Sequence, residues 1–430
     1  MKIKSLATIA LTAIATVSLA ACGSKTESSD SAEKSGDKIV TKLDGTTTIT
    51  FWHAMAGGQG EALEKITKEF MEKNPSIKVT LQNQSSYSDL QAKINSTLQS
   101  PKDLPTITQA YPGWLYSAAS DDMLVDLDSY ISNDTIGWGD QEKITSSLLE
   151  GAQIEGKQYG IPFNKSTEML FYNADMLKEY GVEVPTTMEE LKETAKTIYE
   201  KSNGEVVGAG FDSLNNYYAI GMKNEGVDFN KDLKLTSKAS KEVISYYGEG
   251  IDKGYFRVAG SDKYLSGPFA NKKIAMYIGS SAGEAYTAKD TKGKFEYGVA
   301  ARPSEYNLQQ GTDIYMFANA SAEQRTAAFE FMKYLASPDV QSEWALATGY
   351  MPVVDSVMNS DSYKNASDMK VPAAIADATK KLFSIPVEEN ADSAYSEMRV
   401  IMENIYANPF KDEDKIIKDS VSELEQVWNQ

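Results

Sequence analysis

The sequence predicts an α/β protein whose mostly parallel sheet is covered by helices on both faces. Short β-branched or apolar segments alternate with segments of helical apolar spacing from residue 47 to residue 108, and this alternation is typical of βαβ units. From residue 322 onward the pattern is almost entirely helical. With 430 residues, 41% of them hydrophobic, the chain is long enough for two or three domains or one large two-lobed body.

The individual elements are predicted from the period of their apolar residues. In the first helix, for example, Leu63, Ile66 and Phe70 recur at helical spacing. We expect strands at 47–51, 77–81, 104–108, 167–172 and 274–278. We expect helices at 61–73, 90–98, 188–201, 238–253, 322–335, 340–347, 371–383, 393–407 and 415–428.

The N-terminus has the layout of a secretory signal peptide. A start that contains Lys2 and Lys4 precedes a mostly apolar run from 6 to 17, which is too short to span a bilayer. Leu19-Ala20-Ala21-Cys22 follows and resembles a bacterial lipobox, in which the cysteine receives a diacylglyceryl group. We therefore predict a lipoprotein signal at 1–22, lipidation of Cys22 and a flexible linker at 23–45, which is rich in Ser, Lys, Glu and Asp.

The composition excludes several classes of function. A net charge of −18 argues against nucleic acid as a partner, because phosphate contacts need a basic face. Because His53 is the only histidine, histidine-based metal sites and Ser-His-Asp machinery are disfavoured. We predict no catalytic residues, no metal, no cofactor and a monomer. One alternative of another class stays open, a tethered glycoside hydrolase with two carboxylates roughly 5 to 9.5 Å apart.

Several short motifs resemble those of one known family. They are Phe51-Trp52-His53-Ala54-Met55, Phe70-Met71-Glu72-Lys73-Asn74-Pro75, Gly160-Ile161-Pro162-Phe163-Asn164, Phe269-Ala270-Asn271-Lys272-Lys273 and Thr348-Gly349-Tyr350-Met351-Pro352. Their order and spacing resemble the extracellular solute-binding proteins of bacterial ABC importers. The resemblance implies a two-lobed periplasmic-binding-protein fold of type II, with a mixed sheet flanked by helices in each lobe. The lobes implied are 46–158 with 303–348, and 159–302 with 349–430.

Within that family, the opening motif and Met398-Arg399-Val400-Ile401 resemble the branch that binds sn-glycerol 3-phosphate. The ligand positions of that branch fall on Tyr87, Ser166, Ser280, Gly311, Tyr350 and Arg399. Such a set is a sensible anion cup, because the backbone N–H groups at Ser280 and Ser281 could face a phosphate and Arg399 could hold two of its oxygens. Trp114 is a further candidate, as a wall of the cleft.

The sequence departs from that branch at two places. Pro112 stands where the family has a glutamate that grips the glycerol hydroxyls, and the segment 211–218 lacks the family's tryptophan. The expected ligand is therefore glycerol 3-phosphate or a related glycerophosphoryl compound, with a neutral oligosaccharide as the alternative. Four aromatic residues could stack on sugar rings, namely Trp52, Trp114, Tyr217 and Tyr218. In either case the solute would pass to a membrane permease driven by an ATPase, outside the cell membrane.

Overall fold

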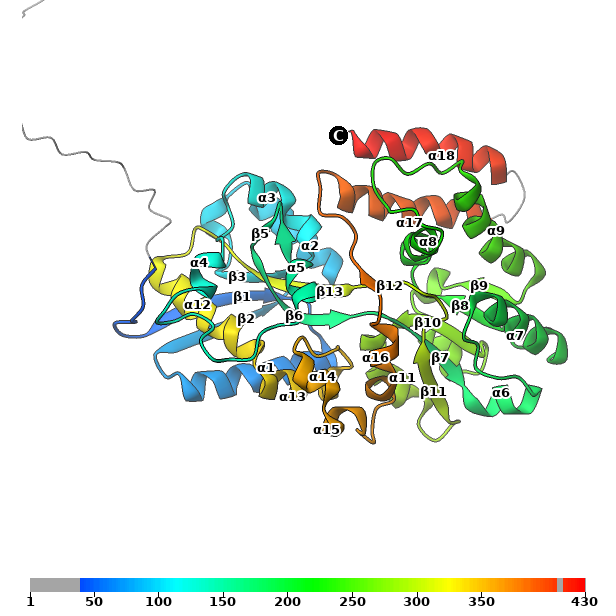
Figure 1. Ribbon diagram of the computed structural model, residues 1–430, viewed down its shortest axis with the longest axis horizontal. Coiled ribbons are helices and arrows are strands. Elements are labelled where there is room, and N and C mark those ends of the chain that lie inside the picture. The colour runs from blue at the N-terminus through cyan, green and yellow to red at the C-terminus, as the bar shows by residue number, and fades with distance from the viewer. Residues whose placement is uncertain (1–38, 408–412, 430) are drawn as a thin grey trace, which may run out of the picture. The chain divides into compact units, whose positions relative to one another are not determined.

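A computed structural model of the protein describes residues 39–407 and 413–429, which belong to one compact unit. The predicted signal, lipidation site and most of the linker lie outside these residues. Two five-stranded sheets organise the described chain, and helices flank both of them (Figure 1). The α/β class and the mixed sheets flanked by helices are thus confirmed.

The strands are β1 (Thr47–His53), β2 (Ile77–Asn83), β3 (Ile107–Ala110), β4 (Gln153–Ile154), β5 (Lys157–Gln158), β6 (Gly160–Ser166), β7 (Glu168–Asn173), β8 (Ala209–Phe211), β9 (Phe256–Val258), β10 (Met276–Ser280), β11 (Tyr297–Ala301), β12 (Asn307–Leu308), β13 (Gln310–Met316) and β14 (Leu382–Phe383).

The α-helices are α1 (Gly57–Lys73), α2 (Tyr87–Thr97), α3 (Tyr116–Ser120), α4 (Asp128–Ile131), α5 (Ser146–Glu150), α6 (Ala174–Tyr180), α7 (Met188–Lys201), α8 (Leu214–Asn224), α9 (Lys238–Lys253), α10 (Ser266–Ala270), α11 (Glu284–Thr291), α12 (Ala322–Leu335), α13 (Pro338–Thr348), α14 (Asp355–Asn359), α15 (Asp361–Lys364), α16 (Val371–Ala378), α17 (Ala391–Ala407) and α18 (Glu413–Trp428). Short 3-10 turns are η1 (Pro101–Asp103), η2 (Pro112–Leu115), η3 (Gly260–Asp262) and η4 (Ser281–Gly283).

The first sheet has the strand order β2-β1-β3-β13-β6. β1 pairs in parallel with β2 and β3, as the βαβ rhythm predicts. β13 is inserted between β3 and β6 and runs antiparallel to both. The expectation of a mostly parallel sheet is therefore wrong for this half, because β13 returns to the first sheet only after the chain has built the second.

The second sheet has the strand order β11-β7-β10-β8-β9. β8 pairs in parallel with β9 and β10, whereas β7 is antiparallel to β10 and β11. The chain passes from one sheet to the other at Thr167, between β6 and β7, and returns through β12. β6 is hydrogen-bonded in the first sheet, just after the lobe border predicted at 158/159. The lobe borders stay predictions.

Several helices begin and end where the sequence predicts, because a side-chain cap marks the start. Thr187 caps α7, Ser237 caps α9, and Ser321 forms a capping box with Gln324 at α12. The helix predicted over 371–383 is wrong at its end, since α16 stops at Ala378 and β14 follows. β14 pairs with the distant strand β12, a contact that helical periodicity cannot reveal.

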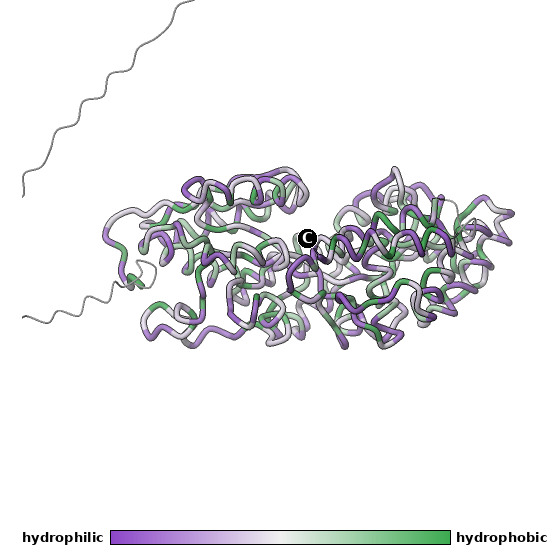
Figure 2. Tube along the Cα trace, turned by 90° about the horizontal axis from the view of Figure 1, so that it is seen from above, coloured by the Kyte–Doolittle hydropathy of each residue, from purple (hydrophilic) through white to green (hydrophobic). Residues whose placement is uncertain are grey.

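Two hydrophobic clusters form most of the core. The larger one contains Phe51 and Phe70 at the first sheet and extends to Phe171 of the second sheet, and the other contains Phe211 and Ile244 at the second sheet. Hydrophilic and hydrophobic stretches alternate along the trace, as amphipathic elements require (Figure 2). Within the part of the chain that the structure describes, no helix combines the length and the apolar character needed to cross a membrane.

Candidate functional site

Two adjoining pockets lie between elements of the two sheets, and we call them together the cleft. The Trp114 pocket has a volume of about 360 Å³ and contains Tyr111, Trp114, Asp392 and Tyr395 in its lining. The tyrosine pocket has a volume of about 640 Å³. It is lined by Tyr87, Asp212, Tyr264, Tyr277, Tyr286 and Tyr350, among others. Both pockets are lined by Ser213, Asn216 and Gln310, so they form one continuous site.

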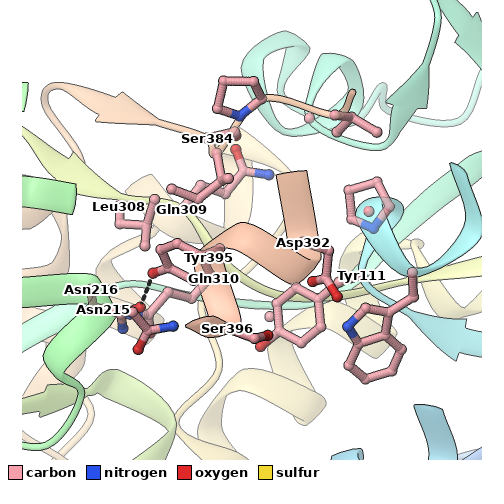
Figure 3. A pocket seen from close by; sticks show the side chains of 18 of the residues that line it. Tyr111, Asn215, Asn216, Leu308, Gln309, Gln310, Ser384, Asp392, Tyr395 and Ser396 are labelled. Carbon is pink, nitrogen blue, oxygen red and sulfur yellow. Dashed lines mark hydrogen bonds between the residues drawn. The ribbon is translucent and has the colours of Figure 1, made fainter. Parts of the chain in front are cut away.

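Elements from both sides of the molecule line the Trp114 pocket. Tyr111 and Trp114 stand at and within η2, which follows β3 of the first sheet. Asp392 and Tyr395 project from α17 and Asn216 from α8, and these helices pack against the core of the second sheet. Figure 3 shows the α17 side chains between Asn216 on one side and Tyr111 on the other, with a hydrogen bond from Tyr395 to Asn216. A solute held here would touch both halves of the protein.

An aromatic wall on the first-sheet side consists of Tyr87, Tyr111 and Trp114. The ring centroids of Tyr111 and Trp114 are 5.1 Å apart, and that of Tyr87 lies 5.9 Å from Tyr111. The hydroxyl oxygens of Tyr87 and Tyr350 are 3.1 Å apart, and the amide Nδ2 of Asn164 donates to Tyr87 at 3.0 Å. Contacts within the protein therefore hold the wall in place, and aromatic rings that line a pocket suit the apolar face of a sugar or another organic ring.

Buried charges in the cleft are mostly compensated within the protein. Lys165 bridges Asp313 at 2.9 Å, and both side chains are buried. Arg302 pairs with Glu168 at 3.1 Å, and Asn216 donates to the other carboxylate oxygen at 3.0 Å. Because an unpaired buried charge is costly, these lysine and arginine side chains are committed to internal partners.

Three carboxylates of the cleft, those of Asp212, Asp290 and Asp392, have no such cationic partner among the salt bridges of the described residues. Asp212 accepts a hydrogen bond from the backbone N–H of Leu265 at 2.6 Å, and burial raises its pKa to about 7. Gln91 of α2 donates to Asp392 at 2.9 Å, and burial raises the pKa of Asp392 as well. The Trp114 pocket thus offers the carboxylate of Asp392, and the tyrosine pocket offers those of Asp212 and Asp290.

The structure brings five of the seven predicted ligand positions to the cleft. Tyr87, Ser280 and Tyr350 line the tyrosine pocket, and Trp114 and Gly311 line the Trp114 pocket. Gly311 has φ +86°, and a Cβ there would lie 2.0 Å from the carbonyl oxygen of Asn164, so glycine is required. That these residues hold a ligand stays a prediction.

The other two predicted positions lie elsewhere. Ser166 is buried at the end of β6, opposite Gln310, and does not line either pocket. Arg399 lies on α17 one turn beyond Tyr395, its side chain is 57% exposed, and it faces Glu403 at 3.4 Å. The structure therefore corrects the expectation for Arg399, because its exposed guanidinium faces Glu403 and lines neither pocket.

The anion cup expected around Ser280 is not assembled either. The backbone N–H of Ser281 donates to the carbonyl of Thr167 at 2.9 Å. The hydroxyl of Ser280 accepts from the N–H of Ala282 at 3.3 Å, so it caps η4. Of the two backbone donors expected to meet a phosphate, that of Ser281 already has a protein partner, and Arg399 does not line the site.

Three of the four aromatic residues expected to stack on sugars are part of the packed interior. Tyr217 and Tyr218 are buried in the second core, with their hydroxyls bonded to Val243 and Ser240. Trp52 is buried under α2 and donates to Gln82 at 2.6 Å. The expectation is wrong for these three because their loop-like sequence context conceals their helix and strand positions. Trp114 alone of the four lines the cleft.

Sequence reasoning missed the acidic residues of the site and most of its tyrosines. One signal was present, since Asp212 directly follows the buried strand residue Phe211, and ligands of α/β sheets bind at the carboxyl ends of strands. Nothing local marks Tyr264, Tyr286 or Asp392, which distant segments bring together. Among the described residues there is no group of three His, Cys, Asp or Glu side chains that could hold a metal ion.

Comparison with known proteins places this architecture among bacterial solute receptors. The sequence profile described as "Bacterial extracellular solute-binding protein" matches residues 65–371. The sn-glycerol-3-phosphate-binding periplasmic protein UgpB of Escherichia coli K12 is 26% identical over 343 residues, which cover 74% of this chain and 77% of that protein.

Solved structures show the same two-lobed fold at lower identity. The GacH receptor of Streptomyces glaucescens, solved unliganded and with acarbose, has a TM-score of 0.75 at 21% identity and covers 90% of this chain and 99% of its own. The cycloalternan complex of an ABC substrate-binding protein from Listeria monocytogenes has a TM-score of 0.76 at 21% identity, covering 90% of this chain and 100% of its own. UgpB from Mycobacterium tuberculosis with glycerophosphocholine has a TM-score of 0.74 at 20% identity, covering 90% of this chain and 99% of its own.

Proposed function

This chain belongs to the bacterial extracellular solute-binding proteins of ABC importers, which bind solutes and are not enzymes, and on that premise we propose that its solute is a carbohydrate without negative charge. The observation that carries the proposal is the lining of the cleft. Aromatic rings, amides and carboxylates line it, the lining residue Lys165 is bonded to Asp313, and Arg302, behind the lining, is bonded to Glu168. Rings offer stacking surface and the polar groups offer hydrogen bonds to hydroxyls, which is the chemistry that a sugar needs.

The solute would be captured between the lobes and delivered intact. Because the cleft is lined from both sides, only a closed arrangement satisfies every contact of the solute, and the solute therefore favours closure. The closed protein would dock on a membrane permease driven by an ATPase. We further propose that Cys22 carries the lipid that holds the protein at the outer face of the cell membrane.

A glycerophosphoryl solute is the second candidate. It is favoured by the curated relatives that bind sn-glycerol 3-phosphate and by the related fold solved with glycerophosphocholine. The position of Arg399 and the engaged donors near Ser280 weigh against a free phosphate end. If glycerol 3-phosphate binds and Arg399→Ala abolishes that binding, the guanidinium reaches the solute and this candidate is favoured.

Titration calorimetry and thermal shift against neutral oligosaccharides, glycerol phosphates and glycerophosphodiesters test the proposal. A neutral oligosaccharide at about 100 times its Kd should stabilise the protein by about 2.7 kcal/mol. Trp114→Ala should weaken that binding at least tenfold, because the wall loses its largest ring, whereas Trp114→Phe should retain part of it. Trp428→Ala, on α18 and outside both pockets, is the matched control. Binding of glycerol phosphates alone would overturn the proposal, and release of sugar products would indicate a hydrolase instead.

A further inference from the structure

The tyrosine pocket contains the most exposed aromatic surface of the described chain. Among all described residues, the exposed large hydrophobic side chains are Tyr264, Tyr286 and Val400, with exposed fractions of 67%, 48% and 38%. Two of these three line the same pocket. Exposed rings that converge on a concavity leave apolar surface in water until a ligand covers it, so they mark a binding surface.

Three other rings of the pocket are held rigidly from behind. Tyr350 is stacked on Trp344 with centroids 5.7 Å apart, and Tyr277 is stacked on Phe171 at 4.8 Å. Tyr87 is tied to Tyr350 through their hydroxyls. The pocket therefore has a fixed aromatic floor and two exposed rings at its opening.

The charge of this pocket has a single sign. Glu168, Asp212 and Asp290 line it, and no lysine, arginine or histidine is among its described lining residues. Glu168 is compensated by Arg302 behind the pocket. Asp212 is not part of any salt bridge among the described residues, and it accepts a hydrogen bond from the neutral backbone N–H of Leu265. A negative charge thus faces a cavity whose walls are electron-rich rings.

Aromatic faces beside a carboxylate attract an organic cation twice, through the ring quadrupoles and through the charge of the carboxylate. An anion would be repelled by both, and a neutral hydroxyl would leave the carboxylate without a counter-charge. We propose that the tyrosine pocket binds a positively charged nitrogen of the solute, an ammonium or quaternary ammonium group, beside Asp212. This inference rests on the proposed solute-binding function and narrows its ligand to a carbohydrate or polyol that carries an amine.

The groups around Asp212 are compatible with this role. Four titratable groups interact electrostatically with Asp212, namely Glu168 on β7, Tyr277 on β10, Tyr247 on α9 and Tyr264 before α10. None of them is a cation. Burial raises the pKa of Asp212 to about 7, so an organic cation that favours the ionised form should bind more weakly as the pH falls from 8 to 6.

A matched pair of probes tests the inference on the full chain. Choline carries a quaternary nitrogen, and 3,3-dimethyl-1-butanol has the same shape with a neutral carbon in its place. We expect choline to bind at least tenfold more tightly than the neutral alcohol, as measured by thermal shift and NMR titration up to 100 mM. Asp212→Asn should abolish this preference and its pH dependence, whereas Asp121→Asn, at an exposed site, should leave both unchanged.

Two substitutions of Tyr286, at the opening of the tyrosine pocket, separate the contribution of its ring to choline binding from that of its hydroxyl. Tyr286→Ala should weaken choline binding severalfold, and Tyr286→Phe should restore it, because the ring face is what attracts the cation. Equal binding of the two probes, no choline binding up to 100 mM, or an unchanged preference in Asp212→Asn would each overturn the inference. Such a result beside normal binding of a neutral oligosaccharide would leave the proposed function intact, so the two failures are distinguishable.

Discussion

Two buried titratable residues act on the stability of this protein in opposite directions. Burial lowers the pKa of His53 to about 4, because the neutral ring is enclosed near the end of β1. Burial raises the pKa of Asp212 to about 7. Between pH 4 and 6.5 the unfolded state binds a proton at His53 that the folded state does not, so stability rises with pH. Over the same range the folded state holds a proton at Asp212 that the unfolded state has lost, so stability falls with pH.

Replacing His53 should expose this balance. In His53→Asn the amide oxygen can still accept the hydrogen bond from the N–H of Met55, now 3.2 Å from Nδ1. The variant should lose the acid sensitivity of the histidine, which amounts to at most about 3 kcal/mol between pH 6.5 and 4. Urea unfolding at pH 7.5, 5.5 and 4.5 measures it.

Asp212→Asn should be measured in the same experiment, because it removes the contribution of Asp212 to the pH dependence of stability, which opposes that of His53. Its stability relative to the original protein should increase as the pH rises from 4 to 7. If the pH profiles of His53→Asn and the original protein are parallel, the histidine does not titrate differently in the folded and unfolded states.

At the scale of elements, the cleft depends on the pairing of β13 with β6. Gly311 is opposite Lys165 in this pair, and the register shifts between Thr312 and Asp313. The shift and the left-handed backbone of Gly311 together let the strand pass close to Asn164 while its edge lines the Trp114 pocket. A strand with regular pairing would present different side chains to the cleft.

Gly311→Ala tests this dependence. The added Cβ would stand 2.0 Å from the carbonyl oxygen of Asn164, and the φ of +86° disfavours any side chain. We expect a loss of about 2 kcal/mol or more in the free energy of unfolding, together with weaker solute binding.

Gly58→Ala is the matched control for that substitution. A Cβ at Gly58, within α1, would meet open space. Because alanine is the better helix former, stability there should stay equal or rise by up to about 1 kcal/mol. Urea unfolding compares the two variants, and equal effects would show that the backbone at Gly311 is not special.

At the scale of the whole molecule, the two halves already touch at the rim of the cleft. Gln91 on α2 donates to Asp392 on α17, and a Cβ at Gly113 would lie 3.0 Å from that of Asp392. The contact joins an element of the first sheet's side to a helix packed on the second core. A solute that favours closure of the two halves would also favour this contact.

The proposed lipid anchor can be tested on the whole chain. If Cys22 carries the lipid, Cys22→Ser should move most of the protein from the membrane pellet to the culture medium, because two acyl chains are what make anchoring stable. Immunoblots of the two fractions measure this, with Ser24→Ala as a control beside the lipobox. A variant that stays in the pellet would contradict the predicted anchor.

Local patterns were sufficient for the class of the fold and for many of its elements. The caps at Thr187, Ser237 and Ser321 and the apolar periods between them act within a few residues, so α7, α9 and α12 can be predicted to the residue. The family motifs likewise indicated the two-lobed receptor, and they pointed to Tyr87, Ser280, Gly311 and Tyr350 in the cleft.

The chemistry of the cleft arises from contacts between distant segments. Whether a charge is available to a solute depends on its partner, and the partners of Lys165 and Arg302 lie more than a hundred residues away, at Asp313 and Glu168. Arg399 on α17 faces Glu403 and does not line the cleft, whereas Asp212 lines the cleft without a cationic partner among the salt bridges of the described residues. Ion pairs between residues that are distant in the sequence cannot be read from local patterns. Because of them, the site is an acidic, aromatic pocket and not the expected anion cup.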